Sequence, residues 1–369
     1  MISLSPRSYD EVLDWICAIQ QIPAPTFQEQ ERAAYLFEEF KRLGYSLVEQ
    51  DAAGNILARW AGGPGKALLV SAHLDTVHSN LKVLPIDRAG NRITGPGVAD
   101  NSTGLAALLM LARHLSEVQP QYPGDIWLAA DVCEEGLGNL AGMRALVDRF
   151  SDQVFAYLIL EGLGLGQVCH RGLGVNRLQV TAETAGGHSW VDFGAPSAIH
   201  ELAKVVAELA DLSLPEKPRS SLNVGVIQGG TSINTIASRA HFLLDLRAED
   251  QLTLLRVCDR AKQSILSHQK TDVKIVIEQI GMRPAGEIPG EHPLVLLGRD
   301  VLNQLKTQSA LEIGSTDANI PLSRGYPAIC IGLTRGNFPH TLREYIEVEP
   351  LKIGLAQLLM LVDQVWRIS

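Results

Sequence analysis

The sequence predicts an α/β protein in which a mainly parallel sheet is covered by helices and an α+β domain is inserted. Short apolar runs alternate with helix-like stretches along most of the 369 residues, a pattern typical of parallel strands joined by helical crossovers. Between about residues 176 and 282 the order becomes strand-helix-strand-strand-helix-strand, which is typical of a two-layer unit of ferredoxin-like type. The chain also exceeds the length at which a single core usually stops growing, so two domains are expected.

The first domain is expected to comprise residues 1–175 and 283–369, on either side of the insertion. Helical apolar spacing is visible at 8–20 and 27–43, and Gly44 is expected to stop the second helix. Strand-like apolar runs follow at 56–60, 67–73, 126–133, 157–161 and 328–333, with helix-like stretches near 103–118 and 139–150 between them. The 103–118 stretch is apolar nearly all round over its first turns, which predicts a buried helix.

The inserted domain is expected to span residues 176–282. Its strand-like stretches are 177–183, 222–228, 241–247 and 273–279, and its helix-like segments are 197–211 and 249–268. Polar and apolar residues alternate better in these strands than in those of the first domain. One face of this second sheet is therefore expected to be less buried.

Composition and charge limit the classes of function. Hydrophobic residues make up 46% and charged residues 20% of the chain, which are values of a globular protein. The net charge of −9 argues against nucleic acid or an anionic membrane surface as the main partner. The five cysteines are scattered without CxxC spacing, which indicates reduced thiols. Because neither a signal-peptide pattern nor an apolar run of roughly 20 residues is visible, we expect a cytoplasmic protein.

Residues of metal-ligand type stand at the ends of several apolar, strand-like runs. They are His73, Asp75, Asp100, Glu134, Glu135, Glu161 and His340. Because open α/β sheets place their sites at the carboxyl ends of strands, these separate segments can converge on one crevice. Two histidines with several carboxylates suit zinc, with cobalt or manganese as alternatives. One carboxylate more than the metals require would remain as a base, so the pattern predicts a dinuclear metallohydrolase.

Several motifs occur in one characteristic order along nearly the whole chain. They are HLDTV, GPGVADNSTG, the EEG after a strand, the strand-end Glu161, GGHSW, GGTSINTI, DLR and HTLREYI. Together they resemble the family of dinuclear-zinc exopeptidases and deacylases, which includes peptidase T, acetylornithine deacetylase, succinyl-diaminopimelate desuccinylase and bacterial glutamate carboxypeptidase. The stretches EEGLGNLAGMRAL and GSTDANIPLSRGYPAICIGL look closest to the peptidase T-like branch.

The resemblance implies how the ligands divide between two divalent ions. His73 would bind one ion with Glu161, and His340 would bind the other with Glu135. Asp100 would bridge the ions, since one carboxylate can give an oxygen to each. The competing interpretations are a loop histidine for His340 and a simple turn at Glu161.

Two further residues would support the metal chemistry. Asp75 lies two residues after His73, on the same face of an extended strand, where it can accept the second N–H of the imidazole and fix its tautomer. Glu134 precedes a ligand and would act as the general base that later passes the proton to the leaving amine. The alternative for Glu134 and Glu135 is a solvated acidic pair at a helix start.

The inserted domain carries a second set of candidates. Arg247 can form a bidentate contact with a substrate carboxylate or with the region of a peptide carbonyl, and Asn234 can donate to the same group. His188 resembles the family histidine that reaches the partner subunit's site and stabilises the oxyanion. The alternatives are a surface salt bridge from Arg247 to Asp245 or Glu249, and a turn histidine at position 188.

The sequence thus predicts a metal-dependent amidohydrolase, in first place a peptidase T-like aminopeptidase that acts on short peptides and forms a homodimer through the inserted domain. An N-acyl-amino-acid deacylase or carboxypeptidase is the alternative, and a non-catalytic binding module on the same fold is a more remote one. Many family members carry a lysine shortly after the bridging aspartate, where this chain has Asn101-Ser102-Thr103. This departure counts against a specific deacetylase. His78, His114, His170 and His200 lack a motif context and are interpreted as structural or solvated.

Overall fold

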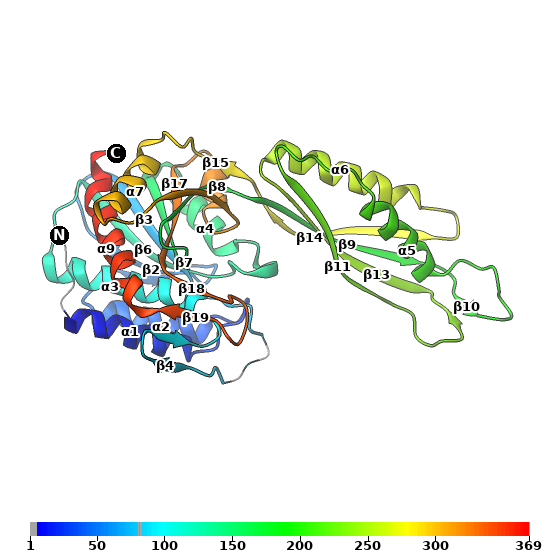
Figure 1. The fold of residues 1–369 in the computed structure, drawn as a ribbon, viewed down its shortest axis with the longest axis horizontal. Helices are drawn as coiled ribbons and strands as arrows, with labels where there is room; N and C mark the ends of the chain where they lie inside the picture. The colour runs from blue at the N-terminus through cyan, green and yellow to red at the C-terminus, as the bar shows by residue number, and fades with distance from the viewer. Residues whose placement is uncertain (1–5, 80, 82, 369) are drawn as a thin grey trace. The chain divides into compact units, whose positions relative to one another are not determined.

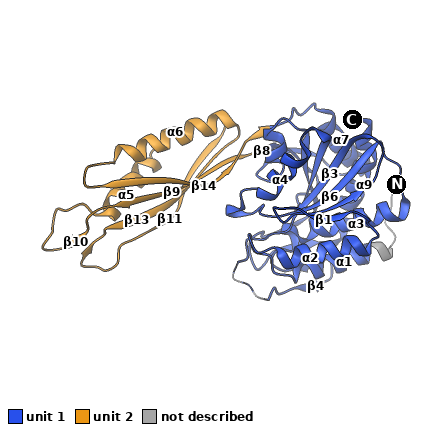
Figure 2. Cartoon of the chain, turned by 180° about the vertical axis from the view of Figure 1, so that it is seen from behind, with its two compact units in different colours: residues 1–172, 287–369 blue, residues 173–286 orange. Residues whose placement is uncertain are grey.

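The computed structural model describes residues 6–79, 81 and 83–368 and divides into two compact units. Unit 1 comprises the chain up to Gly172 and from Glu287 onward, and unit 2 is Leu173–Gly286 (Figure 2). The boundaries expected from the sequence, after residues 175 and 282, lie close to these junctions. Figure 1 shows the elements of both units.

Unit 1 is built on a mixed sheet with a parallel centre. The central strands are β6 Gly124–Asp131, β3 Gly65–His73, β7 Val154–Leu163 and β17 Ala328–Thr334, adjacent in that order and all parallel. The outer strands are β1 Val48–Gln50, β2 Ile56–Trp60, β8 Gln167–Gly172, β15 Gly286–Glu287 and β16 Ala310–Gly314. Strand β2 is antiparallel to β6, and β8 is antiparallel to β17. The predicted mainly parallel sheet is confirmed.

Helices cover this sheet. They are α1 Pro6–Gln20, α2 Gln30–Arg42, α3 Thr103–Val118, α4 Ala141–Phe150, α7 Pro293–Gln304, α8 Asn319–Ser323 and α9 Val348–Gln364. Helix α3 packs on β3, β6 and β7, and every residue of its first ten is buried, as the apolar sequence predicted. Among the described residues, no helix combines the length and apolar character needed to cross a bilayer.

Some expected boundaries shift where the backbone adopts left-handed conformations. Helix α4 begins at Ala141 rather than near 139, because Asn139 and Leu140 have φ values of 56° and 59°. Strand β6 ends at Asp131 rather than at 133, because φ at Cys133 is 60°. These turns redirect the chain at the carboxyl end of the sheet, where the candidate ligands lie.

A second, small sheet in unit 1 joins segments that are far apart in the sequence. Its strands are β4 Asp87–Ala89, β5 Arg92–Thr94, β18 Gly336–Asn337 and β19 Tyr345–Glu347. Strands β5 and β19 pair antiparallel, with Ile93 opposite Ile346. This pairing holds the segment before Asp100 beside the segment that contains His340.

Unit 2 has the predicted ferredoxin-like order. Its main strands are β9 Gly174–Glu183, β11 Ser220–Gly229, β13 Arg239–Ala248 and β14 Lys274–Arg283, and its helices are α5 Ala198–Ala210 and α6 Gln251–Ser267. The antiparallel sheet has the order β11-β13-β9-β14. Alternate residues of β13 are buried under both helices while the others stay partly exposed, which confirms the expected difference between the two faces. A short ribbon pairs β10 Gly187–His188 with β12 Thr235–Ile236.

Candidate metal centre

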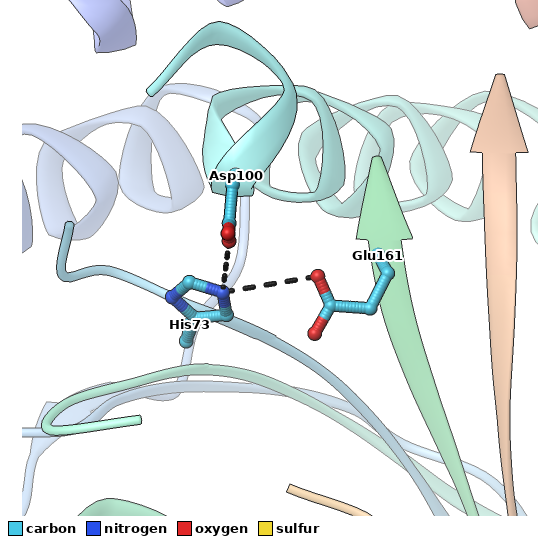
Figure 3. A group of neighbouring side chains, drawn as sticks. All are labelled: His73, Asp100 and Glu161. Carbon is cyan, nitrogen blue, oxygen red and sulfur yellow. Dashed lines mark ion pairs between the residues drawn. The ribbon is translucent and has the colours of Figure 1, made fainter. Parts of the chain in front are cut away.

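Three of the predicted ligands meet at the carboxyl end of the parallel sheet. His73 is the last residue of β3, and Glu161 lies near the end of β7. The Nε2 atom of His73 lies 3.0 Å from Oδ1 of Asp100 and 3.8 Å from Oε2 of Glu161. Figure 3 shows the two carboxylates approaching the same edge of the imidazole from different elements. Because Glu161 lies inside a strand, the alternative of a simple turn at this residue is wrong.

A second group shares Asp100 with the first. The Nε2 atom of His340 lies 2.9 Å from Oδ2 of Asp100 and 3.4 Å from Oε1 of Glu135. Asp100 itself lies in the short segment η1 Val98–Ser102, where its own φ of −118° and ψ of 85° are not helical, and not directly after a strand of the main sheet. Each oxygen of Asp100 therefore faces a different histidine, an arrangement suited to a bridging ligand.

The carboxylates favour charged imidazoles at both positions. Burial opposes the charge on His73, but its contacts with Asp100, Asp75 and Glu161 outweigh burial and hold its pKa well above the ordinary value. The hydrogen bond of His340 with Asp100 and its ion pair with Glu135 raise the pKa of His340 to about 10. Burial raises the pKa of Glu161. The cluster therefore attracts positive charge into a site that is rich in carboxylates.

The donor set fits two divalent cations. In each group the potential ligand atoms lie within 4.8 Å of one another, and the groups are His73-Asp100-Glu161 and Asp100-Glu135-His340. The Oε1 atom of Glu135 is buried without a hydrogen-bond partner among the described residues, although it faces His340. Neutral imidazole nitrogen and carboxylate oxygen are ligands that zinc accepts at about 2.0–2.2 Å. One ion in each group would satisfy the ligand atoms of that group, and Asp100 would be shared by the two ions.

Asp75 supports the centre differently from the prediction. Its backbone carbonyl oxygen, and not its carboxylate, is the nearer partner of Nδ1 of His73, at 3.0 Å against 3.6 Å. The carboxylate instead accepts the backbone N–H groups of Glu134 and Glu135, both at 2.9 Å, and the hydroxyl of Thr26 at 2.8 Å. The chain leaves β3 directly after His73, so the two side chains do not share a strand face. Asp75 therefore fixes the backbone of the Glu134-Glu135 pair as well as the tautomer of His73.

Glu134 is buried beside the ligands. Glu134 and Glu135 are only 5% and 6% exposed, so the alternative of a solvated acidic pair is wrong. Burial raises the pKa of Asp317, and the charges of Asp131 and Glu134 raise it further. A carboxylate that is buried next to a ligand, with its backbone held by Asp75, has the placement expected of a general base.

Two of the unit 2 candidates lie together. His188 pairs with Thr235 in the β10–β12 ribbon, and the N–H of Ser189 donates to the carbonyl of Asn234. The Nδ1 atom of His188 accepts the backbone N–H of Trp190 at 3.2 Å, which leaves Nε2 protonated and able to donate outward. The side chains of His188 and Asn234 are both exposed.

Arg247 lies elsewhere in unit 2 and forms the surface ion pair considered above, with Nε 2.7 Å from Oδ2 of Asp245. It is paired in register with Val175, near the junction with unit 1, whereas Asn234 lies beyond the opposite end of β13 at Arg239. The eight steps from residue 239 to residue 247 span roughly 26 Å at about 3.3 Å per residue. The expectation that Asn234 and Arg247 hold the same group therefore fails within a single chain.

Sequence reasoning missed three buried carboxyl groups near the centre. Glu344 binds the backbone around Asp100, and Asp131 and Asp317 are both 0% exposed beside one another. In the sequence, Glu344 follows an arginine and resembles a solvated charge. Asp131 ends a strand, as many exposed residues do. Only their tertiary partners distinguish them.

Comparisons with known proteins show the family and the fold of the chain. The family model described as Peptidase family M20/M25/M40 matches residues 69–364. Carboxypeptidase G2 of Pseudomonas sp. (strain RS-16) is 26% identical over 342 residues, which cover 86% of this chain and 79% of that protein. Aminopeptidase PepT from Bacillus cereus has a TM-score of 0.78 at 20% identity, covering 97% of this chain and 98% of that one. The Bacillus subtilis YXEP protein, described as a dinuclear metal binding peptidase from M20 family, has a TM-score of 0.73 at 14% identity, covering 99% and 100%. The two structural likenesses show the fold.

Proposed function

The chain belongs to peptidase family M20/M25/M40, and from this premise we propose that it is an exopeptidase that hydrolyses short peptides at a dinuclear metal centre. The observation that carries the proposal is the placement of Asp100, with one oxygen 3.0 Å from His73 and the other 2.9 Å from His340. Glu161 and Glu135 complete the two groups. Zinc is the proposed metal, with cobalt or manganese as alternatives.

Each step of the proposed hydrolysis can be assigned to particular residues of the chain. Two divalent ions held by the ligands would acidify a water molecule and polarise the scissile carbonyl. Glu134 accepts the proton of the attacking water and passes it to the leaving amine. Through Nε2, His188 donates a hydrogen bond to the oxyanion that develops on the carbonyl oxygen. The buried position of Glu134 beside an intact ligand set argues against a non-catalytic binding module.

We assign the free amino terminus of the peptide as the recognised end, as in an aminopeptidase, on the likeness to the PepT structure over 97% of the chain. The sequence similarity to carboxypeptidase G2 favours a second candidate, a carboxypeptidase or N-acyl-amino-acid deacylase. That candidate requires recognition of a free carboxylate, for which Arg247 has suitable chemistry.

The proposed assembly is a homodimer through unit 2. Strand β11 is an edge strand, and its Val226 and Ile227 are 38% and 52% exposed. An exposed apolar edge of this kind can pair with a copy of itself about a two-fold axis. Because Asn234 and Arg247 are far apart within one chain, they can hold one substrate group only if they come from different subunits. In such a dimer, Asn234 of one subunit and Arg247 of the other could contribute to the same active site.

Metal titration tests the centre itself. Protein stripped with a chelator and titrated with zinc should bind two ions per chain, roughly 3.5–4 Å apart in a crystal structure of the loaded protein. A single ion at saturation would contradict the division of ligands around Asp100.

Two blocked tripeptides of the same sequence then identify the recognised end. An aminopeptidase cleaves the tripeptide amide, whose amino terminus is free, and leaves the N-acetyl tripeptide intact. The opposite result, with release of the carboxyl-terminal residue or of acetate, would favour the second candidate. Cleavage of neither peptide, with the unblocked tripeptide also intact in the presence of zinc, cobalt or manganese, would contradict both.

A further inference from the structure

Glu344 forms an unusual set of contacts directly behind the centre. Its side chain is 0% exposed, and Oε1 accepts the backbone N–H groups of Ala99 at 2.7 Å and Asp100 at 2.9 Å. The other oxygen, Oε2, accepts the N–H of Gly97 at 3.1 Å. The backbone carbonyl of Glu344 accepts a fourth N–H, from Gly95, at 2.8 Å. One residue thus binds most of the turn that leads into Asp100.

The backbone of this turn is shaped to surround an anion. Gly97 has a φ of 73°, in the left-handed region, and a Cβ at this position would lie 2.9 Å from Cγ2 of Thr76. A left-handed residue next to right-handed ones turns successive N–H groups toward one point, which forms a concave binding place for anions. Nε2 of His78 lies 3.9 Å from Oε2 of Glu344, beyond hydrogen-bond distance. The N–H groups therefore carry the interaction with the carboxylate.

These contacts matter because Asp100 has to present its two oxygens in opposite directions. We propose that Glu344 is the positioning residue of the bridging ligand: by holding the N–H groups of Gly97, Ala99 and Asp100, it fixes the orientation of the Asp100 carboxylate and so sets the affinity for both metal ions. This inference rests on the proposed dinuclear centre.

The position of Glu344 in the chain adds a second consequence. It lies four residues after His340, so the segment 340–344 both supplies one ligand and orients another. Strand β19 begins at Tyr345, directly after Glu344, and pairs with β5. The small sheet therefore anchors the segment that joins both metal positions. Weakening this anchor should reduce binding of both ions and not of one alone.

The test uses Glu344→Gln, which preserves the size of the side chain. The amide keeps one accepting oxygen but turns an NH2 group toward an N–H donor and removes the charge that strengthens the hydrogen bonds. Zinc affinity of the metal-free protein, measured by competition with a chromophoric chelator, should fall 10–100-fold for both ions, as is typical when partners behind metal ligands are changed. The absorption spectrum of the cobalt-loaded protein should change as well, because the geometry of the bridging carboxylate changes.

A matched control is Glu349→Gln, five residues further along the chain in the first turn of helix α9. Glu349 is exposed and its carboxylate pairs with Lys352, so its variant should retain the parental zinc affinity and cobalt spectrum. If Glu344→Gln does not fold, Glu344→Asp retains the charge but is too short to reach all three N–H groups, and it should weaken binding in the same direction.

The outcomes separate the two proposals. Parental protein that binds two ions, together with a Glu344 variant of unchanged affinity and unchanged cobalt spectrum, would overturn the positioning role alone. Loss of thermal stability with unchanged zinc affinity would do the same, since it would make Glu344 merely structural. Parental protein that binds fewer than two ions would overturn the dinuclear centre itself, and the positioning role with it.

Discussion

The neighbouring residues Glu134 and Glu135 have different partners although they share one turn. Glu135 faces His340 at 3.4 Å and belongs to a metal group, whereas Glu134 does not. Both backbone N–H groups are held by the single carboxylate of Asp75. Removing either side chain should therefore leave the turn in place and reveal the separate role of each residue.

Substitution of the two glutamates gives the first prediction. Glu134→Ala should reduce kcat by about 10²–10⁴-fold, the range typical of general acid–base groups, while the metal content measured by elemental analysis stays at the parental level. Glu135→Ala should lose metal together with activity, because it removes a ligand. Equal loss of metal from both variants would show that the pair is misassigned.

The pair formed by Asp131 and Asp317 gives a prediction about pH. Burial, followed by the charge of Asp131, raises the pKa of Asp317 well above its ordinary value, and burial raises the pKa of Asp131 to about 6. The folded protein therefore binds more protons than the unfolded chain between the ordinary pKa of aspartate, near 4, and these raised values. Its free energy of unfolding should fall as pH rises through that window.

Asp317→Asn removes one of the two buried charges and should flatten this dependence. The melting temperature of the metal-free variant, relative to that of the parent, should be higher at pH 7 than at pH 4. Asp152→Asn changes an exposed aspartate and serves as the control, with a pH profile like that of the parent. Parallel profiles for the parent and Asp317→Asn would show that the pKa of Asp317 is not raised in the folded protein.

At the scale of elements, strand β7 and turn η1 approach each other through their backbones. A Cβ on Gly162 would lie 2.0 Å from the carbonyl oxygen of Ala99. The residues next to these two are the proposed ligands Glu161 and Asp100. The absence of a side chain at Gly162 therefore sets the separation of two ligand-bearing elements.

Gly162→Ala should force η1 away from β7. We expect weaker zinc binding in a competition titration, together with a loss of about 1–3 kcal/mol in the free energy of unfolding, as overpacking of a core typically causes. Gly225→Ala is the control, because a Cβ there would meet only Nδ2 of Asn223 at 3.4 Å. Parental zinc affinity in Gly162→Ala would mean that the turn adapts without moving Asp100.

The elements also show what a sequence can predict. Strand β2 and helix α3 begin and end at the expected residues, because apolar periodicity is a local property. The sheet of β4, β5, β18 and β19 was not predicted, since strands of two or three residues carry no periodic signal. The paired strands β5 and β19 are also about 250 residues apart in the chain.

The same distinction holds for the site. The residue types around His73 and His340 indicated a metal centre, and the structure brings them together in the expected groups. The part played by Glu344 depends on where the turn at Gly97 lies in space. That position follows from long-range packing and not from any local pattern.

At the scale of the whole molecule, the separation of residues within unit 2 constrains the assembly. His188 and Asn234 lie on and beside the β10–β12 ribbon, beyond one end of β13, while Arg247 lies near its other end. A homodimer through the exposed edge of β11 would let the ribbon of one subunit serve the centre of its partner. The site would then be incomplete in a monomer.

Mixing two inactive variants tests this shared site. Glu134→Ala and His188→Ala are each expected to be inactive as homodimers. After dissociation and random reassociation, about half of the dimers should contain one subunit of each kind under closed two-fold pairing. In such a dimer, one site combines the intact Glu134 of one subunit with the intact His188 of the other, and the second site has neither. Roughly a quarter of the parental activity should therefore return.

Mass spectrometry of the native dimers confirms that mixed species are present. If mixed dimers form without recovery of activity, His188 acts in its own subunit or lies outside catalysis, and the exposed ribbon needs another explanation.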